Sequence, residues 1–301
     1  MKLSINVSNL FTRYDFEKCV DIYRTAGFEA MDFGLGSLLE PDSPFSAESY
    51  REYAENIRKF AESQNMPITQ THAPFRFKPK QFEEEFDEVV LPTLVRSLEV
   101  SALLGAEIVV VHPIHYMTYR GHSEEIFERN MAYYRRLLPY CREYGIKVGV
   151  ENMFQKDPVR KYIVHDTCSV KEEFLRYIDT LDSEYMVACL DVGHVSLPLQ
   201  DDTAADIIRA LGHDRLKSLH IHDNDYCSDQ HLLPYMGNLD WAEIAKALGE
   251  INYDGDFTYE TKAMYLDHCD EGFIPIGAKF MADVGKHIIS MINANRPSAE
   301  N

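Results

Sequence analysis

The sequence predicts an α/β protein, a (β/α)8 TIM barrel, and three observations support this fold class. Strand-like apolar runs and helical patterns alternate eight times along 301 residues, and such alternation requires a parallel sheet. Several runs end at a carboxylate or an imidazole, as Val109–His112 does, and this is typical of buried parallel strands that deliver polar groups to one end of a barrel. The rival, a doubly wound open sheet, usually has a glycine-rich phosphate loop after its first strand, and residues 5–9 contain no glycine.

The individual elements follow from hydrophobic periodicity and from the residues that end each pattern. The expected strands are 3–7, 28–34, 67–72, 106–112, 146–152, 186–191, 216–222 and 256–260. The expected helices are 15–26, 46–64, 83–104, 123–144, 169–180, 202–212, 240–249 and 274–293. Four helices are followed by a glycine where a left-handed cap is expected: Gly27, Gly105, Gly145 and Gly212. The chain shows no linker or close internal repeat, so we expect residues 1–301 to form a single TIM-barrel domain.

The composition is that of a chain that buries a large core and carries no membrane or disulfide signal. Hydrophobic residues make up 45% of the sequence, and no stretch approaches the roughly 20 apolar residues of a membrane helix. The start, Met1–Asn6, is too short and polar for a signal peptide. The six cysteines form no CxxC pair, which argues against both a disulfide framework and a thiolate zinc site. We therefore expect a cytoplasmic protein with no membrane partner.

The net charge favours a small-molecule partner over a nucleic acid. Forty-nine acidic residues against 30 basic ones give a formal charge of −19, which repels a polyanion at long range. A protein that follows a nucleic-acid backbone normally shows a basic stripe, and the sequence contains no run of Lys or Arg.

Polar residues end six of the eight predicted strands, on the face where barrels of this type carry their active sites. The third to eighth strands end at His72, His112, Glu151, Asp191, His220 and Glu260. Each buried polar group without a partner costs stability, so six strands that end alike indicate one shared site. Two long connections, 153–168 and 223–239, cover the same face, and connections of that length in a compact barrel are usually lids or binding loops.

Four of these residues form a set that suits a divalent metal ion. They are Glu151, Asp191, His220 and Glu260. A lone buried carboxylate is more often a salt-bridged or hydrogen-bonded core group, but the four together have no Lys or Arg nearby. Lys147 and Lys217 begin their strands, at the opposite end of the barrel. We expect one ion, with Mn²⁺ the first choice because oxygen ligands dominate, and Mg²⁺, Co²⁺ or Zn²⁺ as alternatives.

The order of the strand-end motifs carries a family resemblance. The motifs are Thr71–Pro74, Val111–Pro113, Val150–Asn152, Asp191–His194, His220–Asp223 and Tyr259–Glu260, with Asp229–Pro234 followed by Gly237 and Asp240–Trp241. In this order they resemble the sugar phosphate isomerase/epimerase family of the xylose-isomerase-like barrel superfamily, over essentially the whole chain. The resemblance implies a metal held by the four residues and a hydroxy-ketone sugar substrate. It further implies that Glu151 and Glu260 are the two bases that remove and return a proton beside a carbonyl, through an enediolate.

Six further residues are expected to contact substrate oxygens. They are His72, His112, His194, His222, Asp229 and His231. All of them except His222 also match ligands with which the superfamily's apurinic-site endonucleases bind three zinc ions. That endonuclease-like phosphodiesterase is a rival function, and the charge of −19 opposes it.

A lyase and a binding protein would each share this fold and part of the site. Ketose epimerases of the superfamily usually place an arginine in the loop after the seventh strand, and residues 223–240 contain none. A metal-dependent lyase that eliminates a group β to a keto-sugar carbonyl, as C-glycoside-cleaving relatives do, would use the same proton abstraction. The intact set of four residues opposes a binding protein that lost the chemistry. Barrels of this group often pair through rim loops, so the resemblance also allows a homo-oligomer.

Overall fold

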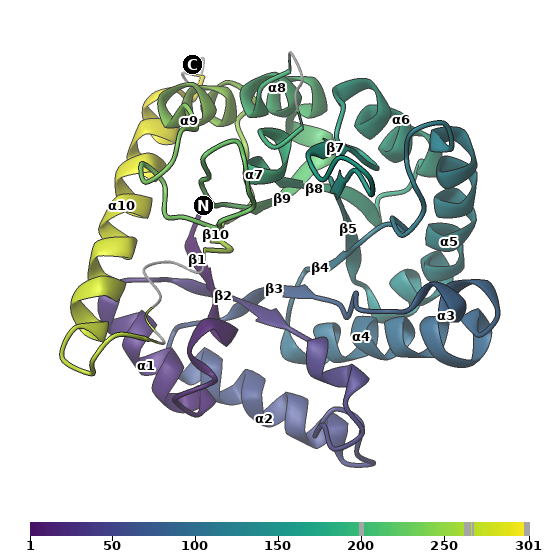
Figure 1. The fold of residues 1–301 in the computed structure, drawn as a ribbon. Coiled ribbons are helices and arrows are strands. Elements are labelled where there is room, and N and C mark those ends of the chain that lie inside the picture. The colour runs from purple at the N-terminus through teal and green to yellow at the C-terminus, as the bar shows by residue number, and fades with distance from the viewer. Residues whose placement is uncertain (199–201, 262–265, 267, 298–301) are drawn as a thin grey trace.

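Eight parallel strands form a nearly closed barrel with helices around it (Figure 1). The computed structural model describes residues 1–198, 202–261, 266 and 268–297. The barrel strands are β1 (Leu3–Asn6), β2 (Ala30–Gly34), β3 (Ile68–His72), β4 (Ile108–Val111), β5 (Lys147–Glu151), β8 (Met186–Asp191), β9 (Leu216–His220) and β10 (Phe257–Tyr259). Their order in the sheet is β10-β1-β2-β3-β4-β5-β8-β9, and a parallel bridge between Ile221 and Tyr259 joins the two ends. The predicted fold class is confirmed.

Amphipathic helices alternate with the strands and cover the outside of the barrel (Figure 1). They are α1 (Phe16–Ala26), α2 (Tyr50–Ser63), α4 (Leu91–Leu104), α5 (Ser123–Tyr144), α6 (Lys171–Leu181), α8 (Ala204–Arg215), α9 (Trp241–Glu250) and α10 (Ile274–Ala294). Each buries an apolar stripe against the strands; in α1 the buried residues include Val20 and Tyr23. No helix in the described ranges is long and apolar enough to cross a membrane.

Two expectations about the helices are wrong in detail. The run 83–104 is not one helix: it contains the end of α3 (Pro79–Glu83), a π-helical turn over Phe86–Val90 and then α4. Pro92 has no backbone N–H to donate, so it favours the first turn of α4 over the middle of a longer helix. Gly212 is not a left-handed helical cap like Gly27, because its φ of 67° and ψ of −176° form an extended conformation open essentially only to glycine.

Both long connections over the carboxyl end of the barrel contain local structure. The connection after β5 forms an antiparallel hairpin of β6 (Phe154–Lys156) and β7 (Ile163–His165). A one-turn helix, α7 (Val192–Val195), follows β8 directly. At the opposite end of the barrel, the Lys217 ammonium lies 3.1 Å from Asp254, as expected for a cation that begins its strand.

The connection after β9 is held by one buried carboxylate, Asp223. Its Oδ1 accepts from the backbone N–H groups of Asn224 at 2.8 Å and Leu239 at 3.1 Å. Its Oδ2 accepts from the backbone N–H of Tyr235 at 3.0 Å and from the indole N–H of Trp241 at 2.8 Å. Because these donors are spread over residues 224–241, a single side chain sets the path of the whole loop.

We expect Asp223→Ala to lower the thermal unfolding midpoint by roughly 5–10 °C, because several buried N–H donors would lose their acceptor. Asp225→Ala is the matched control, since Asp225 accepts hydrogen bonds in the same loop but is exposed to solvent. Thermal unfolding followed by circular dichroism measures both variants. Equal midpoints for the two would show that Asp223 does not organise the loop.

Candidate metal centre

The four residues expected to hold a metal lie together at the carboxyl end of the barrel. One donor atom from each lies within 4.8 Å of the others, in the set Glu151, Asp191, His220 and Glu260. The His220 Nδ1 atom lies 3.1 Å from Glu151 Oε1 and 3.3 Å from Glu260 Oε2. Glu151, Asp191 and His220 are buried, whereas the Glu260 side chain is 25% exposed. The centre is therefore open to solvent on the side of Glu260.

Sheet register and one amide side chain bring these groups to the same level. Asp191 and His220 are register partners in the β8–β9 pair. The Asn152 side chain, one residue beyond β5, accepts from the Asp191 N–H at 2.8 Å and donates to the Asp191 carbonyl at 3.0 Å. The ends of β5 and β8 are thus tied together directly beneath the carboxylates.

The electrostatics of the four residues are dominated by burial and by histidines. Burial alone would raise the pKa of Glu151, but His220 and His112 hold it well below the usual range. Burial likewise disfavours charged His220, yet Cys189, Glu260 and Glu151 raise its pKa well above the ordinary value. Within the described part of the chain, the ion pairs of the centre's three carboxylates are all with histidines. Three converging carboxylates whose ion-pair partners among the described residues include no Lys or Arg form a donor set that fits a divalent cation.

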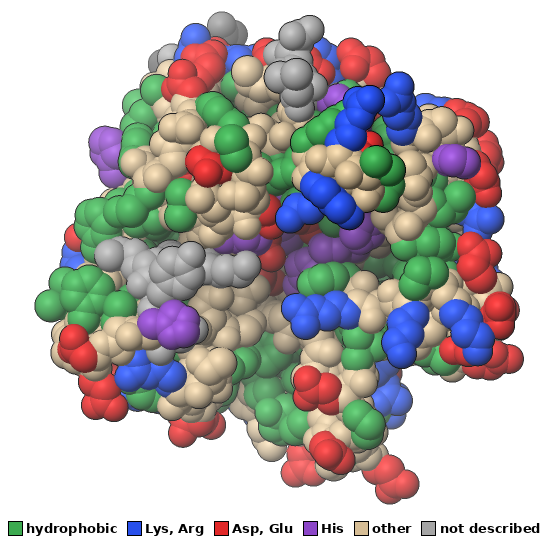
Figure 2. Space-filling view, viewed as in Figure 1, with side chains coloured by type: hydrophobic (Ala, Val, Ile, Leu, Met, Phe, Trp, Pro, Cys, Tyr) green, Lys and Arg blue, Asp and Glu red, His purple; other side chains and the backbone are tan. Residues whose placement is uncertain are grey.

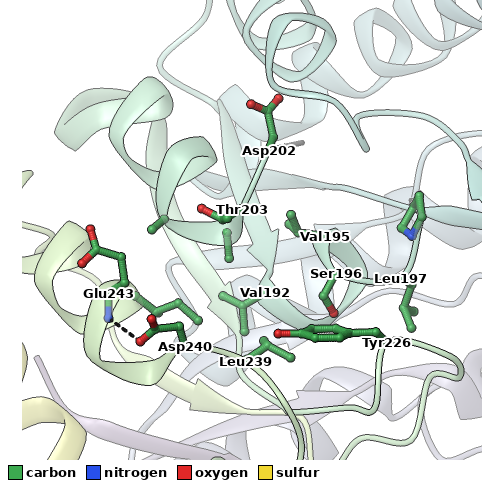
Figure 3. Close-up of a pocket in the computed structure, with 14 residues that line it drawn as sticks. Val192, Val195, Ser196, Leu197, Asp202, Thr203, Tyr226, Leu239, Asp240 and Glu243 are labelled. Carbon is green, nitrogen blue, oxygen red and sulfur yellow. Dashed lines mark hydrogen bonds between the residues drawn. The ribbon is translucent and has the colours of Figure 1, made fainter. Parts of the chain in front are cut away.

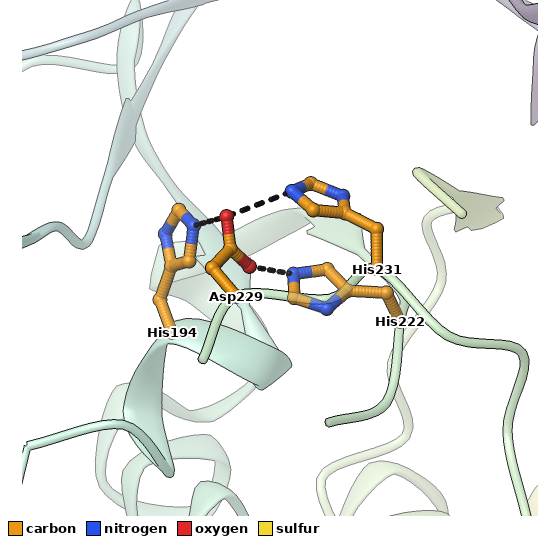
Figure 4. A group of neighbouring side chains, drawn as sticks. All are labelled: His194, His222, Asp229 and His231. Carbon is orange, nitrogen blue, oxygen red and sulfur yellow. Dashed lines mark hydrogen bonds and ion pairs between the residues drawn. The ribbon is translucent and has the colours of Figure 1, made fainter. Parts of the chain in front are cut away.

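Four of the expected substrate contacts form a second group beside Asp191 (Figure 4). The group is His194, His222, Asp229 and His231, again with one donor atom from each within 4.8 Å. Asp229 lies between the imidazoles: its Oδ2 is 3.0 Å from His231 Nε2 and its Oδ1 is 3.7 Å from His222 Nε2. Burial lowers the pKa of His231, but the bond to Asp229 and the charge of Glu260 raise it to about 9.

His222 also contacts the first group, because its Nε2 lies 2.9 Å from Asp191 Oδ1. The ring fits only because residue 193 has no side chain: a Cβ atom on Gly193 would lie 2.0 Å from His222 Cε1. Gly193 lies in α7, which begins immediately after Asp191.

The remaining two expected contacts lie on the other side of the centre, beside Glu151. His112 Nε2 is 3.0 Å from Glu151 Oε2 and 3.0 Å from His72 Nε2. Burial lowers the pKa of His112 to about 4, which keeps this imidazole neutral. Phe75 stacks on the His112 ring with their centroids 4.5 Å apart. All ten site residues expected from the sequence thus surround one point, while their individual roles remain predictions.

One buried acid near the centre was not among the expected residues. Asp32, in β2, is fully buried and accepts a hydrogen bond from the Asn6 amide at 3.0 Å. Burial raises its pKa, against the charges of His220 and His72 that lower it. The signal in the sequence is an acid within an otherwise apolar strand, two residues before the strand ends rather than at its end.

The centre lies at the bottom of a hollow. Figure 2 shows histidine and acidic side chains inside it and Lys and Arg side chains around its rim. A separate cavity of about 410 Å³ lies behind α7, between α8 and the start of α9 (Figure 3). Its acids already have partners, because Asp202 lies 2.7 Å from Lys171 and Glu243 lies 2.6 Å from Arg209. That cavity contains none of the ten expected site residues.

Several solved structures have the same fold. A D-tagatose 3-epimerase-like protein superposes with a TM-score of 0.74 at 21% identity, over 98% of this chain and 99% of its own. The 3-keto-D-glucoside 4-epimerase of E. coli gives 0.70 at 18% identity, over 96% and 99%. The IolI protein with a bound zinc atom gives 0.73 at 14% identity, over 99% and 100%.

Curated sequences are similar over shorter lengths. An uncharacterized protein of Methanocaldococcus jannaschii is 28% identical over 64% of this chain and 63% of its own length. One of Sinorhizobium fredii is 30% identical over 56% and 51%, so the chain spans less than two thirds of these two relatives. The D-psicose 3-epimerase of Enterocloster bolteae is 25% identical over 83% of this chain and 78% of its own.

A family model described as xylose isomerase-like TIM barrel matches residues 20–283. That range contains all the barrel strands except β1 and all ten expected site residues. Since the match covers most of the chain and the observed barrel agrees with it, the chain belongs to the xylose isomerase-like TIM barrel family.

Proposed function

We propose that the protein is a divalent-metal-dependent isomerase or epimerase that acts on a sugar or keto-sugar by removing a proton beside a carbonyl. The observation that carries the proposal is the convergence of Glu151, Asp191, His220 and Glu260 within 4.8 Å. Likeness to a D-psicose 3-epimerase in sequence, and to further sugar epimerases in fold, supports the substrate class.

In this proposal Glu151 and Glu260 move the proton. Both lie near His220 Nδ1, at 3.1 and 3.3 Å, and they come from the ends of β5 and β10, which are not neighbours in the sheet. Histidines keep Glu151 ionised despite its burial, and Glu260 faces the open side, where a substrate enters. A divalent cation held by the four residues would act as a Lewis acid toward the substrate oxygens, worth several kcal/mol. We take Mn²⁺ as the first candidate because three of the four ligands are carboxylates.

The surrounding imidazoles would bind and orient the substrate. Neutral His112 presents either a donor or an acceptor to a sugar hydroxyl, depending on its tautomer. His194, whose Nδ1 is held by the Asn152 carbonyl, would donate from Nε2 to an oxygen on which negative charge develops. Both ring nitrogens of His231 already bond to the Glu260 carbonyl and to Asp229, so this ring would orient Asp229. Phe75 would cover one side of this site and exclude water from it.

A second candidate function is hydrolysis of a phosphodiester with several metal ions. The observation that favours it is the presence of three further groups with ligand geometry: one shares Glu151, one shares His220 and Glu260, and one contacts Asp191. The net charge of −19 opposes long-range attraction of a nucleic acid, so we rank it second.

Asp191→Ala and Glu260→Ala should each reduce bound metal from about one equivalent to near zero, because removing a carboxylate leaves too few ligands. Activity should disappear with the metal while the circular dichroism spectrum stays unchanged. Asp166→Asn is the control, since Asp166 is a buried carboxylate outside the set of four. Elemental analysis that finds no metal in metal-loaded native protein would contradict the proposal.

Glu151→Gln and Glu260→Gln should each lower kcat by about 10²–10⁴-fold, because each removes a proton carrier but keeps the shape of the side chain. In a two-base epimerase, one of the two variants should still exchange substrate hydrogen with D₂O without epimerising the sugar. In a lyase, the leaving group should depart and no epimer should form. Turnover with no deuterium incorporation and no isotope effect at the carbon beside the carbonyl would exclude the mechanism.

His72→Asn and His231→Asn, one from each flanking group, should raise KM or lower kcat while one metal equivalent stays bound. Gly193→Ala should have the same effect as His231→Asn, because its Cβ would displace His222, which belongs to the same group of side chains as His231. Gly36→Ala should be silent, since no atom lies within 4 Å of its Cβ position. Loss of a second metal equivalent, together with nicking of abasic duplex DNA by the native protein, would favour the phosphodiesterase instead.

A further inference from the structure

Resting on the proposed function, we propose that the substrate is a keto-sugar joined to an apolar, planar group, as in an aryl glycoside, and that a cavity beside Glu260 binds this group. The cavity has a volume of about 620 Å³ and extends from the candidate centre along the carboxyl ends of β1 and β2. Glu260 belongs both to this cavity and to the centre, and His72, which also lines the cavity, lies 3.6 Å from Glu151. A ligand at the centre would therefore extend into it.

The size of the cavity exceeds what a free sugar needs. Pockets of about 300–1,000 Å³ hold drug-sized ligands and bury most of their surface. A six-carbon sugar held at the centre would leave much of the 620 Å³ filled only by water. An additional group on the sugar would use that space.

The wall of the cavity is aromatic. Three ring pairs form a continuous row: Phe11 and Phe33 at 5.9 Å, Phe33 and Phe45 at 6.0 Å, and Phe45 and Tyr53 at 5.1 Å between centroids. Phe33 and Phe45 are buried, so the ring surface that this row offers to another planar group belongs to Phe11 and Tyr53. The row begins near the carboxyl end of β2 and ends on α2, away from the centre.

Several of these apolar side chains are exposed although they lie side by side. Phe11, Leu39, Tyr53 and Phe75 are 37%, 37%, 39% and 43% exposed, and all four line this cavity. A contiguous apolar surface in contact with water usually marks a binding site. Its continuity with Glu260 and His72 points to the substrate itself as the occupant.

The charges in the cavity favour a neutral group over a phosphate. Outside the centre, and among the described residues, the charged lining side chains are Arg76 and Glu40, one of each sign. The Arg76 guanidinium lies 5.8 Å from the centroid of Phe75, where it extends the planar surface. A phosphate group would need several donors of positive charge, and Arg76 is the one that the described lining residues supply outside the centre.

Gly36 allows a direct test, because a Cβ there meets no atom within 4 Å and the residue lines the cavity. The probes are a 3-keto-aldohexose and the same sugar with a phenyl group on its anomeric oxygen, which leaves the ketone at carbon 3 free, assayed with metal-loaded native protein in D₂O. We expect kcat/KM for the phenyl derivative to be at least about 10-fold higher, as burial of a ring implies. Gly36→Trp should remove this advantage and leave the free sugar unaffected, while Gly36→Ala should keep it.

The outcomes separate the two proposals. Turnover of the free sugar with no gain from the phenyl group, or equal loss of both substrates in Gly36→Trp, overturns the cavity assignment alone. Absence of exchange and epimerisation with both sugars overturns the proposed function. In that case, calorimetric binding of the phenyl derivative that weakens in Gly36→Trp still supports the cavity assignment. If the phenyl derivative does not bind, the cavity assignment is overturned as well. If Gly36→Trp does not fold, Tyr53→Ala replaces it and should weaken only the phenyl derivative. A native dimer that Gly36→Trp dissociates would assign the cavity to a second copy of the chain instead.

Discussion

The burial of the Glu151 carboxylate is the constraint on which the rest of the centre depends. The Glu151 side chain is 1% exposed, and four imidazoles lie within 3.7 Å of its oxygens. An ion in such a place is tolerated only when other charges and hydrogen bonds compensate it. The neighbouring strands supply that compensation: His72 from β3, His112 after β4 and His220 from β9 all turn toward this one group.

The supporting structure keeps these polar groups from relaxing away from each other. Asn152 fixes the end of β8 against β5, and Asp223 fixes the loop that carries Asp229 and His231. Gly193 leaves the space that the His222 ring occupies. Each of these residues fixes geometry through contacts within the protein. The geometry of the site therefore depends on residues that a search for metal ligands alone would not find.

Much of the fold was accessible from the sequence because buried parallel strands and amphipathic helices have different periods. Strand bounds agree within two residues, and the polar strand ends converge because the carboxyl ends of a barrel share one face. The split before α4 was missed although Pro92 signals it, and Asp32 was missed because it lies inside a strand. The division of the histidines between Glu151 and Asp191 was not accessible, because it depends on side-chain direction and loop path.

The place where the barrel closes has a consequence for how the site can be observed. Between β9 and β10 the sheet is joined by the Ile221 N–H to the Thr258 carbonyl at 2.9 Å and by the Glu260 N–H to the Ile221 carbonyl at 3.1 Å. On the β10 side these two bonds involve Thr258 and Glu260 and so flank Tyr259, and the seam where the barrel closes ends at one of the central carboxylates. Local opening there requires little more than breaking this pair. Amide hydrogen exchange at Ile221 and Glu260 should thus slow when the site is filled, and it would report occupancy without knowledge of the reaction.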